Sequence, residues 1–242
     1  MTTDTHKKEY AIQFELGGKV CTVGAIGKGS GMIAPNMATM LAFYTTDAAV
    51  SPALLEKALK TVVPGTYNQM SVDLDTSTND TLIIMASGLA GNPEICEENA
   101  DYAAFVAALT AIAEHMCAEH AGDGEGATHL ITCEVTHAPD LKTARAVSRS
   151  VVCSNLFKAA VFGRDATGDA SCAPSATPPG TSPLIRSASG FPARRARCMC
   201  ARTPPTTRTA RMKPPRCWQS TIFWSRWIWA PARQAPRRGA VT

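Results

Sequence analysis

The sequence predicts an α/β (α+β) domain over residues 1–166, followed by a tail of different character. Short apolar runs alternate with longer segments of helical periodicity, a pattern typical of helices packed on a sheet. The charges divide at the same place. Residues 1–166 carry 11 Lys and Arg against 19 Asp and Glu, whereas residues 167–242 carry 13 against 1, with 11 of the 16 prolines. About 160 residues are enough to bury a sizeable core, so each part is interpreted separately.

The first elements are a predicted hairpin and a buried strand. Tyr10–Leu16 alternates weakly between apolar and polar residues, and Gly17-Gly18 then turns the chain into Lys19–Ile26. Two glycines favour a tight hairpin turn because they accept positive φ angles. Met40–Thr45 is a short apolar run, typical of a buried strand.

The helices are predicted from their starts and their periodicity. A helix over Pro52–Val63 is favoured because Ser51 is a good N-cap and proline is tolerated at the first helical position. Asn99–His120 is the longest predicted helix, since apolar residues recur at spacings of four, three and four; they are Phe105, Leu109, Ile112 and Met116. Leu141–Phe162 is a further helical stretch. Two more strands complete the domain, at Thr81–Ala86 and Ala127–Thr136.

Composition excludes several classes of protein. No apolar run approaches the roughly 20 residues of a membrane helix, and MTTDTHKKEY has no apolar core behind its charges, unlike a secretory signal. The nine cysteines include no Cys-x-x-Cys pair. We therefore expect reduced thiols in a cytoplasmic protein without membrane contacts. Cys133 and Cys153 are predicted to be small core residues.

The densest chemical signal is GKGSGMIAPNMATML, residues 27–41. Glycines around Lys28 suggest a phosphate cradle. The Walker pattern fails, however, because Thr22 stands where its first glycine belongs and Gly29 stands where Ser or Thr should follow the lysine. A plain turn is the simpler interpretation, yet it leaves the small pair Ala38-Thr39 unexplained.

Thr39 is a candidate nucleophile only if a base activates it, because a hydroxyl is weakly nucleophilic at neutral pH. Cleavage before Thr39 would create such a base. The new α-amino group, with an ordinary pKa of about 7.7–8.0, can accept the hydroxyl proton. An internal threonine can make this cut when its Oγ attacks the preceding carbonyl, here that of Ala38. Composition alone does not distinguish Thr39 from other threonines.

Three segments resemble the ornithine acetyltransferase family, the glutamate N-acetyltransferases of arginine biosynthesis. They are KGSGMIAPNMATMLAFYTTDA, NQMSVDLDTSTNDT at residues 68–81 and GDGEGATHLI at residues 122–131. Their order and spacing also fit, and the resemblance covers residues 9–166.

The resemblance implies a reaction and its residues. The precursor cuts itself between Ala38 and Thr39. Thr39 is then the catalytic nucleophile, which takes acetyl from N-acetylornithine as an ester and passes it to glutamate; acetyl-CoA is a donor in some members, and no cofactor or metal is used. Lys28, Thr39 and Glu125 match substrate-binding positions, since a cation can hold a carboxylate and an anion an ammonium group. From the residues alone, Lys28 is better explained as a solvated loop lysine and Glu125 as a solvated turn carboxylate.

The resemblance also implies a layered αββα fold of the self-processing N-terminal-nucleophile type, incomplete in this chain, and an α2β2 heterotetramer. Residues 1–38 would be the end of the α chain, and residues 39–166 the β-chain core. The family's oxyanion-hole Thr-Gly pair has no candidate in residues 1–38. Because loss of one oxyanion donor costs on the order of 100–1000-fold in rate, we expect this chain to be inactive and its self-cleavage to be slow or absent.

The composition of residues 167–242 is typical of a nucleic-acid-binding arm, since arginines would supply affinity and the four tryptophans would stack on bases. The family, however, continues after residue 166 with a segment like NWGRIL. Back-translated in a shifted frame, residues 166–172 can encode NWGRIL, and residues 222–230 and 233–242 can encode LLVEVDLG and ASATAWGCD. We therefore interpret the tail as out of frame, expect it to be disordered, and expect no nucleic-acid partner.

Two alternative functions stay open. One is a hydrolase of the same self-processing type, which would send the acyl group to water. The other is a non-enzymatic protein that binds nucleic acid through its basic tail.

Several polar residues receive simpler interpretations. Asp73, Asp75 and Asp80 form a carboxylate cluster, but the surrounding Ser, Thr and Asn side chains favour local turns, and we expect no metal there. His115 and His120 are expected on the surface of the long helix. His129 and His137 are assigned no role.

Overall fold

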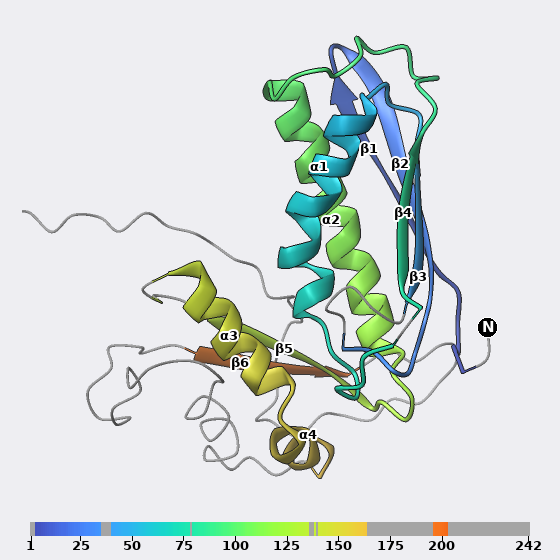
Figure 1. The fold of residues 1–242 in the computed structure, drawn as a ribbon. Helices are drawn as coiled ribbons and strands as arrows, with labels where there is room; N and C mark the ends of the chain where they lie inside the picture. Colours follow the sequence, from blue (N-terminus) through green and yellow to red (C-terminus); the bar gives the residue numbers. More distant parts are fainter. Residues whose placement is uncertain are drawn as a thin grey trace, which may run out of the picture.

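The protein was analysed as a computed structural model, which describes residues 3–34, 40–77, 79–135, 138, 140–163 and 196–202. Its main body is a four-stranded sheet in the order β1-β2-β3-β4. Helices α1 and α2 lie along one face of this sheet (Figure 1). A second, two-stranded sheet with its own helices lies at one end of the main body. The predicted mixture of sheet and helices is confirmed.

The main sheet begins with the predicted hairpin. β1 (Lys8–Leu16) and β2 (Lys19–Lys28) are antiparallel, and Gly17 and Gly18 turn the chain with φ angles of 53° and 74°. β3 (Leu41–Thr46) pairs antiparallel with β2, and β4 (Thr81–Ala86) pairs parallel with β3. A parallel neighbour requires a crossover connection, which here contains α1 (Pro52–Val62) and two short turns of 3-10 helix, η1 (Val63–Gly65) and η2 (Tyr67–Gln69).

The long helix α2 (Ala100–Gly122) supplies much of the core. Its N-terminus is capped by Asn99, whose side chain accepts a hydrogen bond of 2.9 Å from the Tyr102 amide, which satisfies one of the free donors of the first turn. The four apolar residues that predicted the helix are at most 1% exposed; they are Phe105, Leu109, Ile112 and Met116. Helical periodicity therefore identified the buried face of α2 correctly.

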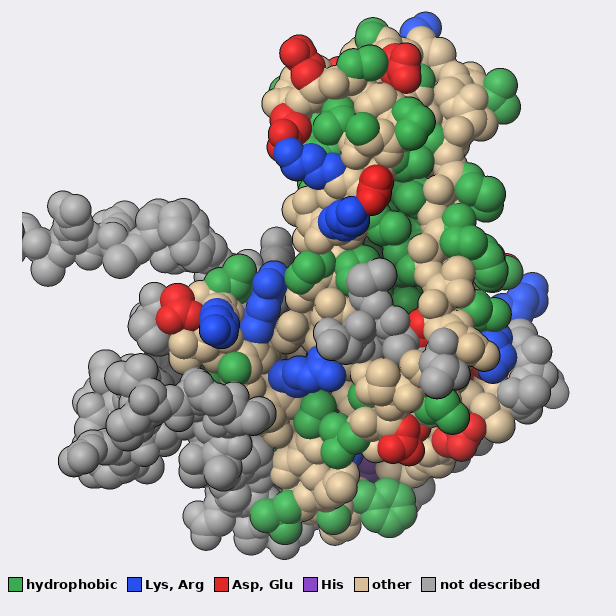
Figure 2. All heavy atoms as spheres, viewed as in Figure 1, with side chains coloured by type: hydrophobic (Ala, Val, Ile, Leu, Met, Phe, Trp, Pro, Cys, Tyr) green, Lys and Arg blue, Asp and Glu red, His purple; other side chains and the backbone are tan. Residues whose placement is uncertain are grey.

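The opposite face of the main sheet carries exposed apolar side chains. Because side chains alternate between the two faces of a strand, a set of residues points away from α1 and α2, and its members are 38–64% exposed: Val20, Ile26, Leu41, Ile83 and Met85. Figure 2 shows hydrophobic side chains along the side where β3 and β4 lie. One helical layer and one sheet are thus the described part of the predicted αββα arrangement.

The second sheet pairs β5 (His129–Val135) with β6 (Ala196–Arg202) in antiparallel fashion. The predicted helical stretch beside it is divided into α3 (Leu141–Val152) and α4 (Asn155–Phe162). The division occurs because Ser154 caps a new helix, its Oγ accepting a hydrogen bond of 3.2 Å from the Phe157 amide.

The tail does not follow its prediction throughout. The seven residues of β6 form a strand where we expected disorder, and their pairing covers an edge of β5 that would otherwise be open. The rest of residues 167–242 lies outside the described residues.

The predictions for thiols and membrane segments can be compared with the described residues. Cys133 is 2% exposed, as predicted, whereas Cys153 is only partly buried. Cys153 is a free thiol. Among the helices that the structure describes, none has the length and apolar character needed to cross a membrane.

Candidate functional site

The turn that carries Glu125 is bonded to the loop that follows Lys28, although 97 positions separate these two predicted substrate-binding residues. Lys28 ends strand β2, and Glu125 lies in the turn that follows α2. The Glu125 amide donates a hydrogen bond of 2.8 Å to the Ser30 carbonyl, which joins this turn to the loop after Lys28. A Cβ atom at Gly31 would lie 2.7 Å from Glu125 Oε1, so a larger residue at this position would displace the Glu125 carboxylate.

The loop after Lys28 is held by Asp73. The Asp73 carboxylate accepts hydrogen bonds of 2.5 and 2.9 Å from the amides of Met32 and Ile33. Met32 has a φ angle of 55°, a left-handed conformation that few side chains favour, so these bonds stabilise an unusual backbone. The sequence analysis grouped Asp73 in a carboxylate cluster, but its carboxylate instead fixes the backbone of the loop after Lys28. Among the described residues, no group of three His, Cys, Asp or Glu side chains could hold a metal ion.

The proposed nucleophile Thr39 and the cleavage residue Ala38 lie outside the described residues, as do all of residues 35–39. Both ends of this segment are anchored. Thr76 Oγ donates a hydrogen bond of 3.2 Å to the Ala34 carbonyl, and the Thr81 amide donates one of 2.9 Å to the Met40 carbonyl. The segment thus connects the Lys28 loop to the start of β3, an inner strand of the sheet.

Asp80 lies beside the start of β3, because the next residue of β4 is paired with Leu41. Burial raises the pKa of the Asp80 carboxyl to about 6, although the nearby Met40 amide opposes this shift. A carboxyl group with a pKa of about 6 therefore lies at the start of β4, next to Met40 at the start of the neighbouring strand β3. The sequence analysis missed its significance because it grouped Asp80 with Asp73 and Asp75, which do not share its surroundings.

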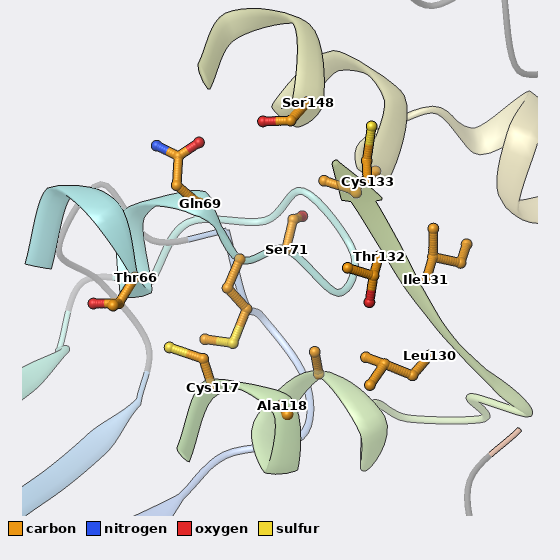
Figure 3. Close-up of a pocket in the computed structure, with 13 residues that line it drawn as sticks. Thr66, Gln69, Ser71, Cys117, Ala118, Leu130, Ile131, Thr132, Cys133 and Ser148 are labelled. Carbon is orange, nitrogen blue, oxygen red and sulfur yellow. The ribbon is translucent and has the colours of Figure 1, made fainter. Parts of the chain in front are cut away.

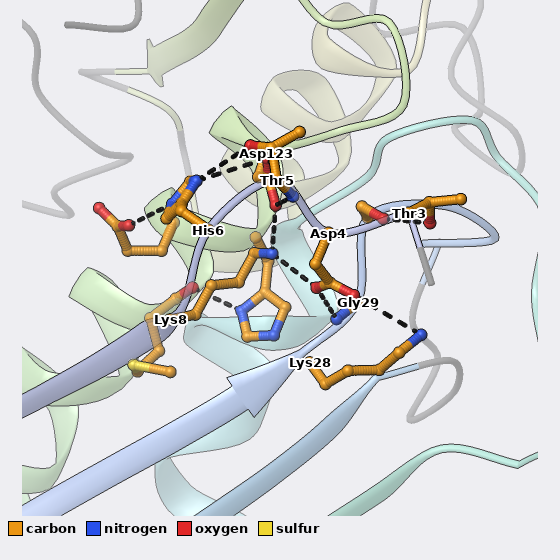
Figure 4. A network of polar contacts seen from close by, with 12 residues as sticks. Thr3, Asp4, Thr5, His6, Lys8, Lys28, Gly29 and Asp123 are labelled. Carbon is orange, nitrogen blue, oxygen red and sulfur yellow. Dashed lines mark hydrogen bonds and ion pairs between the residues drawn. The ribbon is translucent and has the colours of Figure 1, made fainter. Parts of the chain in front are cut away.

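A buried ion cluster lies beside Lys28 (Figure 4). Lys8 Nζ donates hydrogen bonds of 2.7 Å to Asp4 Oδ1 and 2.5 Å to Asp123 Oδ2. Burial opposes ionisation of Asp4, but hydrogen bonds from Lys8 and from the Gly29 amide outweigh it and lower the pKa of this carboxyl to about 2. The sequence analysis assigned nothing to these residues. The available signal was that Lys8 stands two residues before the predicted strand Tyr10–Leu16, in phase with its alternate apolar residues Ile12, Phe14 and Leu16.

The prediction for His120 is wrong. His120 is fully buried, and its Nδ1 lies 2.6 Å from the Met116 carbonyl. Burial lowers the pKa of His120 to about 4, with the contact to Met116 opposing the shift. A Cβ atom at Gly27 would lie 2.5 Å from the His120 ring, so strand β2 of the main sheet passes directly over the imidazole. His115 is partly exposed and stacks on Tyr10 with ring centroids 3.8 Å apart.

Two hollows lie near this region. The pocket in Figure 3 opens between η2, α2, β5 and α3, and none of the described residues that line it is charged; its lining includes Gln69, Ser71, Cys117, Thr132 and Ser148. Burial raises the pKa of the Cys117 thiol, which makes this group unreactive. The second hollow is lined by Glu125 and Lys158 among others, and so brings opposite charges to the predicted site.

The chain is similar to known proteins over residues 1–169. The model of the ArgJ family matches residues 1–169. The chain is 54% identical over 166 residues to the arginine biosynthesis bifunctional protein ArgJ of Symbiobacterium thermophilum, covering 69% of this chain and 41% of that protein. It is 50% identical over 165 residues to the protein of the same name from Listeria monocytogenes, covering 68% and 42%.

A solved structure is also similar. The crystal structure of arginine biosynthesis bifunctional protein ArgJ from Bacillus halodurans has a TM-score of 0.51 and 36% sequence identity, over 54% of this chain and 61% of that one. The chain spans about two fifths of the length of the curated relatives named above. The family match covers well over half of the chain and includes every predicted site residue. The chain therefore belongs to the ArgJ family.

Proposed function

We propose that this chain carries the nucleophile and part of the substrate site of an acetyltransferase that moves acetyl from N-acetylornithine to glutamate. The observation that supports this proposal most directly is the hydrogen bond between Ser30 and Glu125. This bond joins the turn that carries the anionic Glu125 to the loop after the cationic Lys28, and the same loop leads along the chain to Thr39. An amino-acid substrate presents a carboxylate and an ammonium group, which this pair can bind together.

The proposed reaction begins with self-cleavage. Thr39 Oγ attacks the Ala38 carbonyl carbon, the peptide nitrogen leaves as the new α-amino group of Thr39, and water hydrolyses the resulting ester. In each catalytic cycle this amine takes the Thr39 hydroxyl proton as Oγ attacks the acetyl carbon of N-acetylornithine. Ornithine leaves with that proton, and the amine of glutamate then attacks the acetyl ester to give N-acetylglutamate and free Thr39.

The other parts of this proposal follow the resemblance. Acetyl-CoA is the second acetyl donor, as in some members of the family, and no cofactor takes part. The intact enzyme is an α2β2 heterotetramer of the cytoplasm. The oxyanion donors lie outside residues 1–38, and we expect the 242-residue chain alone to transfer acetyl extremely slowly because these donors stabilise the charge of the transition state.

The test uses a chimera in which residues 9–166 replace the matching segment of the Symbiobacterium thermophilum relative. We expect the chimera to form N-acetylglutamate from N-acetylornithine and to show two chains by intact mass, cut before Thr39. Thr39→Ala should abolish both properties, whereas Thr39→Ser should retain part of each because a hydroxyl remains.

Other outcomes would identify a different function. A cut chimera that releases acetate without forming N-acetylglutamate would indicate a hydrolase. An uncut and inactive chimera that folds normally would contradict the proposal. Salt-dependent nucleic-acid binding by the 242-residue chain, lost on deletion of residues 167–242, would favour the basic-tail alternative.

A further inference from the structure

The buried ion cluster near Lys28 contacts both halves of the proposed site. It consists of Asp4, Lys8 and Asp123, whose side chains are at most 3% exposed. A buried ammonium group is costly unless carboxylates pair with it and accept its hydrogen bonds. Lys8 satisfies this condition with one aspartate from the N-terminal segment and one from the end of α2. The ammonium group therefore ties these two segments together.

Asp4 connects this cluster to Lys28. Its Oδ1 accepts hydrogen bonds of 2.7 Å from both Lys8 Nζ and the Gly29 amide. Its Oδ2 is buried and has no hydrogen-bond partner among the described residues, but the Lys28 ammonium lies 3.8 Å away (Figure 4). One oxygen of Asp4 thus holds the backbone after Lys28, and the other attracts its charged end.

Asp123 connects the cluster to Glu125. It follows α2 directly and stands two residues before Glu125. Besides Lys8, its carboxylate accepts hydrogen bonds from the amide and hydroxyl of Thr5. These bonds outweigh burial and lower the pKa of the Asp123 carboxyl, so the group stays ionised. The turn that carries Glu125 is in this way attached to the same N-terminal segment as the Lys28 loop.

The charges of the cluster also matter for binding. Two carboxylates and the Lys8 ammonium leave one negative charge, which the Lys28 ammonium balances. An ammonium group has three N–H donors, and a single contact with Asp4 leaves donors available for a substrate carboxylate. Without Lys8, the surplus negative charge would oppose that carboxylate. A long lysine side chain also loses much rotamer freedom on binding, and the Asp4 contact restricts it in advance.

We infer that Asp4 is a positioning residue for Lys28, and that Lys8 couples the Lys28 loop to the Glu125 turn. The role of Lys28 toward a substrate rests on the proposed function. The coupling itself does not, so the two can be tested separately.

The first test measures hydrogen exchange in the 242-residue chain and its Asp4→Asn variant. Asparagine keeps an oxygen for the Gly29 amide but removes the charge. We expect exchange of the amides of residues 29–33 to rise roughly tenfold, the factor that corresponds to about 1.4 kcal/mol, with a smaller rise at residues 123–127 and no change in α1 or β4.

The matched control is Asp47→Asn. The Asp47 carboxylate also accepts a hydrogen bond from a β2 amide, that of Thr22, at 2.7 Å, but far from Lys28 along the strand. We expect this variant to leave exchange at residues 29–33 unchanged. Unchanged exchange in Asp4→Asn would overturn the inference, because Asp4 would then not hold the loop. An equal rise in α1 and β4 would also overturn it, because Asp4 would then stabilise the whole domain alike.

A second measurement does not depend on Asp4→Asn and covers the case in which that variant does not fold. Nitrogen-15 spectra of the lysine ammonium groups should show Lys28 with a shifted resonance and slowed proton exchange compared with exposed Lys19. Identical behaviour of Lys28 and Lys19 would contradict the Asp4 contact. Lys28→Arg assigns the resonance.

Calorimetry with glutamate and N-acetylornithine separates the inference from the proposed function. Binding to the parent chain that weakens severalfold in Asp4→Asn but not in Asp47→Asn supports both. If the parent chain binds neither compound, the proposed function fails for this chain, while the exchange and ammonium data still decide the inference. Equal affinity of all three proteins would overturn the role of Asp4 in binding.

Discussion

The two sheets of this protein are stabilised to very different degrees. The main sheet packs against α1 and α2 over a continuous cluster of 24 buried residues. Beside the second sheet, the residues whose side chains are described form a buried cluster of three, Cys133, Val151 and Phe157, and one of the two strands comes from the tail. The proposed site lies on the main body, where Lys28 and the Glu125 turn follow β2 and α2. The residues proposed to bind substrate therefore adjoin the larger of the two cores that the described residues form.

The largest expected effect comes from the core of the main body. Phe105→Ala should lower the free energy of unfolding by about 3–5 kcal/mol, because it removes a fully buried aromatic ring and leaves a cavity. Phe157→Ala is the matched change in the smaller cluster, and we expect about 1–3 kcal/mol there because that site can collapse more easily. Urea unfolding followed by circular dichroism measures both. Equal losses would show that the two sheets share one core.

Deletion of residues 167–242 tests the separation more directly. The deletion removes β6, and we expect the amides of β5 to lose protection from hydrogen exchange, since they lose a pairing strand. Amides of β1–β4 should keep their protection. If protection falls in the main sheet as well, the second sheet supports the site after all.

The pH dependence of stability should report His120 in the main body. Its pKa is lowered to about 4 in the folded protein, whereas the unfolded chain binds the proton near pH 6.5. Between these values the unfolded state holds more protons, so the free energy of unfolding should fall as the pH falls, by on the order of 3 kcal/mol in all.

Asp80 has the opposite sign, because its pKa is raised to about 6. The folded protein holds more protons on Asp80 than the unfolded chain between pH 4 and 6, so stability from this group is lost as the pH rises.

The difference between the parent chain and His120→Gln isolates the histidine contribution. If the two proteins show the same slope with pH in urea unfolding, His120 does not titrate as a buried group.

The smallest expected effect on stability comes from Gly31→Ala. The new Cβ would meet only the end of the Glu125 side chain, which can move aside, so we expect a loss below about 1 kcal/mol. Glutamate binding should nevertheless weaken if the parent chain binds it, because Glu125 is displaced. Gly91→Ala is the contrasting variant: it has open space around the new Cβ but a φ angle of 69°, so it should cost stability without affecting binding.

Much of the main body could be predicted from local patterns. The Gly17-Gly18 turn and the periodicity of α2 each act within a few residues, so the hairpin and the buried face of that helix were correctly identified. The break between α3 and α4 was missed because one serine cap competes with an otherwise continuous helical pattern. The strand β6 was unexpected because pairing with β5 depends on residues more than 60 positions away.

The candidate site divides in the same way. The order of residues determined that Lys28 precedes the Ala38-Thr39 pair and that Glu125 follows a long helix, and this order was sufficient to identify the family. Only the tertiary structure decided that the Glu125 turn is bonded to the loop after Lys28, that His120 is buried, and that Asp4, Lys8 and Asp123 form one ion cluster. The physical reason is that burial and charge pairing arise between segments far apart in the chain, whereas local sequence encodes turns, caps and periodicity.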